Sequence, residues 1–526
     1  MNVNQNKIQI TIYKHHYLLE AYTPKNMFII SKFARNYKED PPRNVNVKHK
    51  QEVAFYGSVN VPGTMVRLHI NTVLAFKRHL LSIGFPVDSL IVVKKPPPVD
   101  AVEYDLNVRE KYKPLPHQVE SVNYISDPNG PISRLVPLQM GKGKTVIALM
   151  GMVNRKKRFI ICVLAKYVQK WIGDVITIMD LEREDIFVIE SGKDLNKAIM
   201  GAVDHPVIII GNRLLRNMHK SYEQTSGREG YKYHCMPDEL MEKLGVDSML
   251  IDEIHQEFHS MFSMSLHHHL NLIVGLSGTF KSNDESRLRM FSLMFPHSDR
   301  LEEQEHDKYV SLHPIQYNVN APEKMRFMNN ALNSYSHITY EQSLMRHRKS
   351  LEDYLDMIGY YVDISYIKRR TAGQKLMVYA SSIKMVTYIT NYLSNRFPDL
   401  DIRRYVEQDP YENCIVSDIR VSTILSSGTA IDIPDLITVL MTTSILSLTS
   451  NLQAFGRLRK IKGVSTRFYY LWCSDISKQR AYHYDKLKVM ESYATGVTPM
   501  RYHNVIGSDT RPSSKIPYDR ILMLDK

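Results

Sequence analysis

The feature that most constrains the fold of this 526-residue chain is a glycine-containing loop that ends at Thr145. Residues 135–145 read Leu-Val-Pro-Leu-Gln-Met-Gly-Lys-Gly-Lys-Thr, and residues 146–153 continue as an apolar run with helical spacing. A strand, a glycine turn and the start of a helix form the context in which a phosphate-binding loop works. The segment therefore predicts a nucleoside triphosphate site on an α/β sheet.

The residues of this loop have separate expected roles. Gly141 and Gly143 let backbone N–H groups approach phosphate oxygens, because glycine places no Cβ in the way, and Lys142 between them is expected to belong to the same ATP-binding loop. Lys144 is expected to reach the β- and γ-phosphates of ATP, and Thr145 to bind Mg²⁺ at the positive end of the new helix. An ordinary glycine turn with chance lysines is the alternative, but the strand–helix junction favours nucleotide binding.

Length and composition limit the remaining possibilities. A chain of 526 residues is expected to form three or four domains. No stretch approaches the roughly 20 apolar residues that cross a bilayer, and residues 1–7 do not begin a signal peptide. The cysteines are far apart, with no CxxC pair, which predicts a reducing, cytoplasmic setting (Cys162, Cys235, Cys414, Cys473).

The net charge of +13 is concentrated at the start of the chain. Residues 1–99 hold 14 Lys and Arg against 5 Asp and Glu, which is typical of a domain that binds a polyanion. A cluster of basic residues is expected to contact the phosphates of such a polyanion: Lys32, Arg35, Lys38, Arg43, Lys48 and Lys50. A basic face that serves only solubility is the alternative, since charge alone identifies no ligand.

Four segments are expected along the chain. They are a small basic α+β domain (1–99), an ATP-binding α/β domain (100–300), a second α/β domain (301–476) and a basic helical extension (477–526). In the first, the expected strands are 8–13, 52–56, 65–69 and 89–93, and the expected helices are 26–37 and 71–83. In the second half, a helical region to about residue 370 should precede strands at 375–379, 403–406, 419–423, 436–440 and 467–472.

Two acids follow an apolar strand of the first α/β domain. Ser248-Met-Leu-Ile leads into Asp252 and Glu253, at the strand end where open α/β sheets place ligands. One acid is needed to hold Mg²⁺, and the next can polarise the water that attacks the γ-phosphate. A helix cap would use the same residues, but the phosphate loop upstream favours catalysis.

The histidines nearby raise the question of a metal site. His255 and His259 lie four residues apart, and His267, His268 and His269 follow. The glutamate that a zinc-protease motif requires after its first histidine is absent, so surface or hydrogen-bonded histidines are expected.

Taken in order, the motifs resemble those of superfamily 2 helicases over residues 110–475. Gln118 resembles the glutamine that reads adenine, and residues 252–255, Asp-Glu-Ile-His, resemble a DExH box. The other matching segments are residues 141–145, 277–279, 427–434 and 453–460, the last expected to open a helix. Within the superfamily the layout is similar to that of bacteriophage recombination helicases, with a short chain and a small basic domain before the motor.

The resemblance implies two tandem RecA-like domains that bind ATP and Mg²⁺ between them. It assigns the phosphates to Lys144, the metal to Asp252 and Thr145, and the attacking water to Glu253. Its remaining assignments are transition-state charge (Arg457 with Lys460 or Arg459), ATP binding (Asp432), coupling (Ser277, Thr279, Gln453) and the DNA path (Lys166, Asn212, Thr429). The implied activity is ATP-driven unwinding or branch migration of forked and four-way DNA in recombination, repair or replication restart. The implied enzyme is a monomer in the cytoplasm of a bacterial host.

Three positions depart from the motifs of the family. Leu138 replaces a small residue, Ala430 replaces glycine, and Lys460 stands where arginine is usual. Lysine lacks the guanidinium fork, so either Arg457 supplies most of the charge or Arg459 takes the second arginine position. The departures leave open a DNA-binding scaffold with a degraded motor. An RNA helicase is a further alternative, because such motors mainly grip nucleic-acid backbones.

Overall fold

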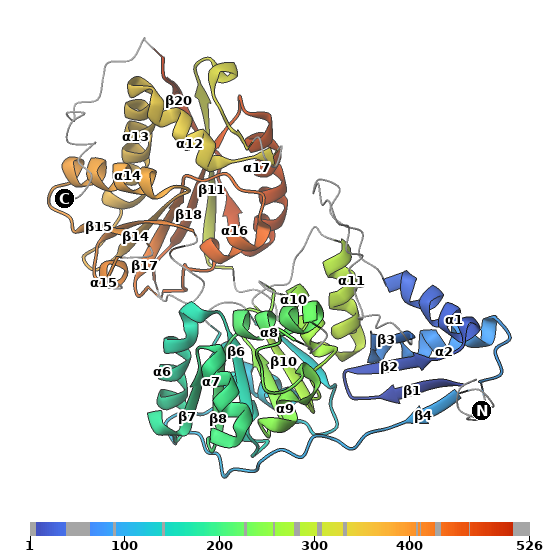
Figure 1. Cartoon of the computed structure of the whole chain (residues 1–526). Coiled ribbons are helices and arrows are strands. Elements are labelled where there is room, and N and C mark those ends of the chain that lie inside the picture. The colour runs from blue at the N-terminus through green and yellow to red at the C-terminus, as the bar shows by residue number, and fades with distance from the viewer. Residues whose placement is uncertain are drawn as a thin grey trace. The chain divides into compact units, whose positions relative to one another are not determined.

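The structure of the chain, a computed structural model, describes residues 7–37, 64–87, 91–138, 142–225, 229–255, 258–277, 285–301, 308–329, 334–406, 409–410, 412–424, 426, 433–461 and 463–508. Two compact units divide the chain between Gln304 and Glu305 (Figure 1). Several predicted site residues lie outside the described residues: Lys38, Arg43, Lys48, Lys50, Gly141, Thr279, Thr429 and Asp432. The strand expected at residues 52–56 also lies outside them.

The first unit begins with a four-stranded sheet in the order β3-β2-β1-β4. Its elements are β1 (Ile8–Ile12), β2 (His16–Ala21), α1 (Pro24–Ala34), β3 (Thr64–His69), α2 (Val73–Ser82) and β4 (Ile91–Lys94). Thr23 caps α1 by accepting a hydrogen bond from the backbone N–H of Asn26, and Pro24 occupies the first turn. The predicted α+β domain is confirmed here, although β2 was not predicted.

The two faces of this small sheet have different partners. Strand alternation turns Tyr17 and Leu19 of β2, with Leu68 opposite on β3, toward the helices that Figure 1 shows on one side of the sheet. The same alternation turns His16 and Arg67 to the opposite face, where both are buried. That second face packs against the rest of the unit.

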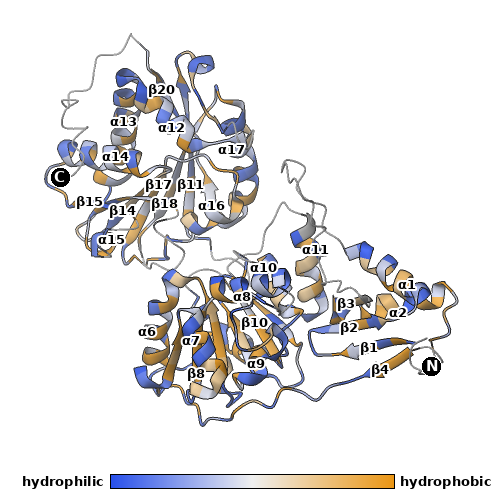
Figure 2. Cartoon of the chain, viewed as in Figure 1, coloured by the Kyte–Doolittle hydropathy of each residue, from blue (hydrophilic) through white to orange (hydrophobic). Residues whose placement is uncertain are grey.

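A six-stranded parallel sheet forms the rest of the first unit, in the order β5-β10-β9-β6-β8-β7. Its strands are β5 (Ser133–Pro137), β6 (Phe159–Val163), β7 (Ile186–Ile189), β8 (Val207–Gly211), β9 (Ser248–Ile251) and β10 (Leu272–Ser277). The helices are α4 (Pro116–Ser126), α5 (Lys144–Val153), α6 (Val168–Ile178), α7 (Gly192–Lys197), α8 (Asn212–Thr225), α9 (Leu240–Lys243), α10 (Phe258–Ser265) and α11 (Glu285–Met294). The strands are apolar, as the colours of Figure 2 show for β8 and β10, and most of their residues are buried, because helices cover both faces of a parallel sheet.

The small sheet and the parallel sheet share one apolar core. Residues of both, including Leu68 and Phe262, belong to a single cluster of buried side chains. Polar contacts cross the same boundary: His15 Nδ1 lies 3.2 Å from Ser133 Oγ, and Arg67 pairs with Asp238. The N-terminal domain is therefore built into the first unit.

The second unit contains a larger parallel sheet in the order β15-β16-β14-β17-β18-β11-β19, with β20 also paired to β11. The strands are β11 (Val310–Val319), β14 (Lys375–Ala380), β15 (Ile402–Tyr405), β16 (Ile419–Thr423), β17 (Leu436–Met441), β18 (Thr466–Cys473), β19 (Ala494–Val497) and β20 (Met500–Ile506). The two-residue strands β12 (Met328–Asn329) and β13 (Ser334–Tyr335) form a separate pair. The helices are α12 (His337–Arg346), α13 (Arg348–Val362), α14 (Ile383–Arg396), α15 (Glu412–Ile415), α16 (Leu448–Phe455) and α17 (Ser477–Met490). The predicted fold class, two tandem RecA-like α/β sheets preceded by a small α+β domain, is confirmed.

Three local expectations for the second unit were wrong. Residues 310–319 form the strand β11, where the sequence analysis placed a helical region. The segment after residue 477 contains, besides the expected helix α17, two strands that join the sheet. The segment from Gln453 to Lys460 does not open a helix but straddles the end of α16 at Phe455.

Among the described residues, none of the helices combines the length and apolar character needed to cross a membrane.

Candidate nucleotide-binding site

The predicted phosphate-binding loop joins β5 to α5. Strand β5 ends at Pro137 and α5 begins at Lys144, with Gly143 as the residue before the helix. Gly143 has a φ of +79°, in the left-handed region that glycine adopts at little cost. Its carbonyl accepts the hydrogen bond of Ile147 N–H at 3.0 Å, which starts the helix. A Cβ on Gly143 would also force the side-chain amide of Gln118 to move, so the left-handed backbone favours glycine here and an added side chain would disturb the contact with Gln118.

Gln118, on the neighbouring helix α4, holds the backbone of the loop at Lys142. Its Oε1 accepts a hydrogen bond from Leu115 N–H at 2.9 Å, and its Nε2 donates one to the carbonyl of Lys142 at 3.0 Å. Only 5% of the residue is exposed. The side chain expected to read adenine therefore also positions the backbone of the loop.

Lys144 places a buried ammonium group at the start of α5. Among the described residues, Nζ has no hydrogen-bond partner, and it lies 3.6 Å from Glu253 Oε1. The burial of a cation is normally compensated by hydrogen bonds as well as by opposite charge. The ammonium group of Lys144 has one carboxylate nearby and, in the described part of the chain, no hydrogen bond, so its burial is only partly compensated. The group is suited to phosphate oxygens.

Asp252 and Glu253 follow β9 directly, at the carboxyl edge of the sheet. Trp171 Nε1 donates a hydrogen bond of 2.9 Å to Asp252 Oδ2, which orients that carboxyl group. Burial raises the pKa of Asp252, and the neighbouring charge of Glu253 raises it further, against the opposing charge of Lys144. Glu253 has a φ of +46°, an uncommon conformation for a residue with a side chain. Two crowded carboxyl groups beside one lysine form a site that favours an added cation.

His255 links these acids to the next strand of the sheet. Its Nδ1 lies 3.2 Å from Glu253 Oε2 and 3.0 Å from Ser277 Oγ at the end of β10. Burial lowers the pKa of His255 to about 4, and the charge of Lys144 lowers it as well, so the ring is neutral near pH 7. A continuous set of contacts thus runs from Lys144 through Glu253 and His255 to Ser277. The sequence analysis considered His255 as the last residue of the DExH box and as a possible metal ligand, and it did not predict this link between Glu253 and Ser277.

The residues present fit Mg²⁺ and a triphosphate. Thr145 is the second residue of α5, and Asp252 supplies a half-buried carboxylate directly after β9; hydroxyl and carboxylate oxygens are the ligands that Mg²⁺ prefers. Lys144 supplies the unsatisfied ammonium group described above.

Two residues expected on the DNA path follow neighbouring strands at the same edge of the sheet. Lys166 comes after β6 and is exposed, with Nζ 5.0 Å from the centre of the Tyr167 ring. Asn212 is the first residue of α8 directly after β8, and it is 9% exposed. Because all six strands run parallel, both residues lie on the edge that carries the phosphate loop and Asp252.

The expected transition-state residues belong to the second unit and follow α16. Arg457 is buried, with 3% of its surface exposed, whereas Lys460 is exposed. The Arg459 guanidinium donates a hydrogen bond to the carbonyl of Gly456 in its own turn. Gln453 lies within α16 and is half-buried.

On the N-terminal domain, Lys32 of α1 and Arg35 immediately after it are exposed.

His267 and His268, two of the histidines considered for a metal site, are buried and hydrogen-bonded. His267 Nδ1 lies 3.1 Å from Asp238 Oδ1, and His268 Nε2 lies 3.0 Å from His219 Nε2. The described residues contain no group of three or more His, Cys, Asp or Glu arranged to hold a metal ion. His267 and His268 are buried where the N-terminal domain meets the parallel sheet.

Comparison with known proteins gives similarity in structure but not in sequence. No family model matches the sequence, and no curated protein matches it. The chain is similar to the Pyrococcus furiosus Hef helicase domain (12% identity, TM-score 0.43, 72% of this chain and 99% of that chain). It is also similar to S. cerevisiae Dbp5 bound to RNA and ADP BeF3 (11%, 0.46, 74% and 90%) and to T4 UvsW (12%, 0.34, 94% and 99%).

Proposed function

We propose that this protein is an ATP-dependent helicase or translocase that acts on DNA, with forked or four-way junctions as its substrates. The observation that carries the proposal is the buried ammonium of Lys144, which has no hydrogen-bond partner among the described residues and lies beside Glu253. This geometry supports a phosphate site, and the ordered helicase motifs of the sequence support the coupling of that site to nucleic acid.

In the proposed reaction, Lys144 leaves its contact with Glu253 to bind the β- and γ-phosphates of ATP. Asp252 and Thr145 would hold Mg²⁺, which would supply positive charge next to the transferred phosphoryl group. Glu253, once released from Lys144, orients and polarises the water that attacks the γ-phosphate. Arg457 of the second unit, with Lys460, stabilises the transition-state charge.

The contacts of Glu253 are proposed to couple ATP hydrolysis to the binding of nucleic acid. Glu253 contacts His255, and His255 contacts Ser277, whose motif continues to Thr279. A change in the carboxylate of Glu253 during hydrolysis therefore alters the hydrogen bonding of a residue that leads into the proposed DNA path. Gln453 provides the corresponding polar group in the second unit.

The N-terminal domain is proposed to hold duplex DNA beside the motor. Its described residues contain a single acid, Glu20, against exposed Lys32 and Arg35 on one helix and Lys77 and Arg78 on the other. Such a surface favours backbone phosphates without reading the sequence of bases.

One experiment tests the substrate class. ATP turnover is measured with single-stranded, duplex, forked and four-way DNA and with RNA, at one salt concentration. The proposal expects the greatest stimulation by branched DNA. Greater stimulation by RNA would establish the RNA helicase alternative, and DNA binding without turnover would establish the scaffold.

A further inference from the structure

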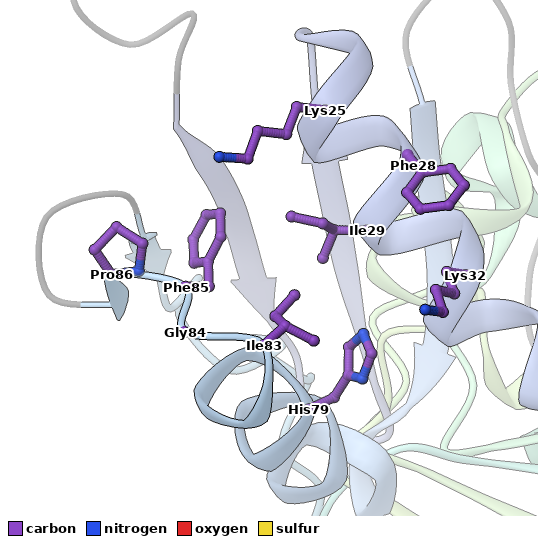
Figure 3. A pocket seen from close by; sticks show the side chains of 9 residues that line it. All are labelled: Lys25, Phe28, Ile29, Lys32, His79, Ile83, Gly84, Phe85 and Pro86. Carbon is purple, nitrogen blue, oxygen red and sulfur yellow. The ribbon is translucent and has the colours of Figure 1, made fainter.

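The N-terminal domain contains a groove between its two helices, and the assignments above use only Lys32 among the residues that line it. It has a volume of about 430 Å³, and nine residues line it: Lys25, Phe28, Ile29, Lys32, His79, Ile83, Gly84, Phe85 and Pro86. Figure 3 shows the residues of α1 along one wall, and those of α2 and the turn after it along the other. The groove faces away from the parallel sheet, because the opposite face of the small sheet packs there.

The end wall of the groove is fixed by the way α2 terminates. Gly84 has a φ of +66°, and its N–H donates to Leu81 O at 3.1 Å, while Phe85 N–H donates to Leu80 O at 2.9 Å. These two bonds form a Schellman motif, in which a left-handed glycine ends the helix and the next residue packs back on it. Phe85 is accordingly buried, so the floor of the groove is preformed and apolar.

The rim of the groove combines an exposed aromatic ring with cations. Phe28 of α1 is 63% exposed, a large exposure for a phenylalanine, and Lys25 and Lys32 each lie about one turn from it on the same helix. Residues 24–37 and 73–87 contain no Asp or Glu. The rim therefore suits a ligand with a flat apolar part, which would contact Phe28, and with negative charge, which would contact the lysines.

A polar atom at the groove is also unsatisfied. His79 Nε2 is buried and, among the described residues, has no hydrogen-bond partner. A buried ring nitrogen without a partner is costly unless a ligand or water supplies one.

We infer that this groove binds an unpaired nucleotide of a single strand, with its base against Phe28 and its flanking phosphates at Lys25 and Lys32. Aromatic stacking platforms with neighbouring cations are how proteins hold single strands without reading their sequence. The inference rests on the proposed function, since it names a second contact for the same nucleic acid. An apolar peptide would satisfy Phe28 but would leave the cationic, acid-free rim without complementary charge.

The test is the affinity of the full-length protein for a fluorescent dT20 strand and for an abasic strand of equal length. Phe28→Ala should weaken dT20 binding by about 5- to 150-fold, the range that loss of one stacked base gives. It should leave binding of the abasic strand unchanged, because that strand keeps the phosphates and lacks the bases. Leu74→Ala, which shortens an exposed apolar residue of α2 outside the groove, is the matched control and should change neither affinity.

The lysines give an independent measurement. Lys25→Gln should lower the salt slope of dT20 binding by about 0.7, the value for one phosphate contact of a single strand. Lys77→Gln, an exposed lysine of α2 outside the groove, should lower it less. Equal dT20 affinity of Phe28→Ala and Leu74→Ala would overturn the inference, as would an equal loss on the abasic strand. ATP turnover of the unaltered protein is measured separately, so its absence would refute the proposed function while the Phe28 result still decides the groove.

Discussion

Single residues determine how the nucleotide site is preorganised, and Gly143 and Lys144 illustrate two different ways. Gly143 contributes by what it lacks, since a Cβ would both strain the backbone and displace Gln118. Lys144 contributes a charge that is buried before any ligand arrives. The sequence motif predicted that both residues belong to the phosphate-binding loop. The hydrogen bond from Gln118 to Lys142 and the missing partner of Lys144 depend on segments that are distant in sequence, so only the structure could reveal them.

Gly143→Ala is expected to weaken ATP binding at least about tenfold. The left-handed backbone costs an alanine roughly 1–2 kcal/mol, and the new methyl group displaces Gln118 from the loop. Gly173→Ala is the matched control, because a Cβ at this helical glycine of α6 meets no atom within 4 Å. The measurement is nucleotide affinity by fluorescence titration. Equal affinities of the two variants would contradict the assigned role of Gly143.

Lys460→Ala is expected to reduce ATP turnover more than Arg459→Ala. The Arg459 guanidinium is bonded to the carbonyl of Gly456 in its own turn, whereas Lys460 is exposed. Lys460→Arg should be tolerated, because the charge is retained. Steady-state turnover with saturating nucleic acid decides the matter. A greater loss in Arg459→Ala would identify Arg459 as the transition-state residue.

At the scale of elements, burial decided which strands could be predicted. Strands such as β6 and β17 are short apolar runs, and such runs alone indicate strands of a parallel sheet that is buried on both faces. Strand β11 was missed because polar residues and Pro314 interrupt it. Two strands pair with the same edge of β11, β19 with residues 310–312 and β20 with residues 315–319. Pro314 lies between these two paired segments, where its missing N–H interrupts neither pairing. A pairing of that kind depends on segments nearly 200 residues away and leaves no local pattern.

The surface that joins β2 and β3 to the parallel sheet is expected to weaken in mild acid. Burial lowers the pKa values of His15, His69 and His268 to about 3, so these rings are neutral in the folded protein. Histidines of the unfolded chain take up protons near pH 6.5, so their contribution to stability is complete above that pH. It is lost as the pH falls from about 6.5 toward about 3. Each such histidine should cost roughly 2 kcal/mol of unfolding free energy at pH 5.

His16→Phe provides the control for this prediction. Neither ring nitrogen of His16 has a hydrogen-bond partner among the described residues, and the ring stacks on Tyr13 at 4.7 Å. Phenylalanine keeps the stacking and removes the titrating group. Urea unfolding at pH 7.5 and pH 5 should show a smaller loss of stability in the variant. The same loss in both proteins would show that protonation of His16 does not contribute to the response of this surface to pH.

At the scale of the whole molecule, the N-terminal domain cannot be treated as a detachable module. Its core is continuous with that of the parallel sheet, and Asn71 Nδ2 donates a hydrogen bond to Leu293 O at 2.6 Å across the boundary. Removing residues 1–99 would expose this buried surface. The proposed grip on duplex DNA is therefore best tested by charge changes in the intact chain.

The double variant Lys32→Gln, Arg35→Gln is expected to bind a fork more weakly and with a flatter dependence on salt. For B-form DNA, each phosphate that the protein no longer neutralises lowers the slope of log affinity against log salt by about 0.9. The measurement is fork affinity at several salt concentrations, with and without the two substitutions. If the charges serve solubility alone, the two slopes will be equal.

The central claim is that Glu253 and Lys144 form the hydrolytic site of a nucleic-acid-stimulated ATPase, and one comparison tests it directly. ATP turnover and ATP affinity are measured for the unaltered protein and for Glu253→Gln, both with saturating forked DNA. We predict that turnover falls at least about a hundredfold in the variant, because its amide cannot polarise the attacking water, while ATP affinity stays within a few-fold. Near-normal turnover in Glu253→Gln would contradict the account.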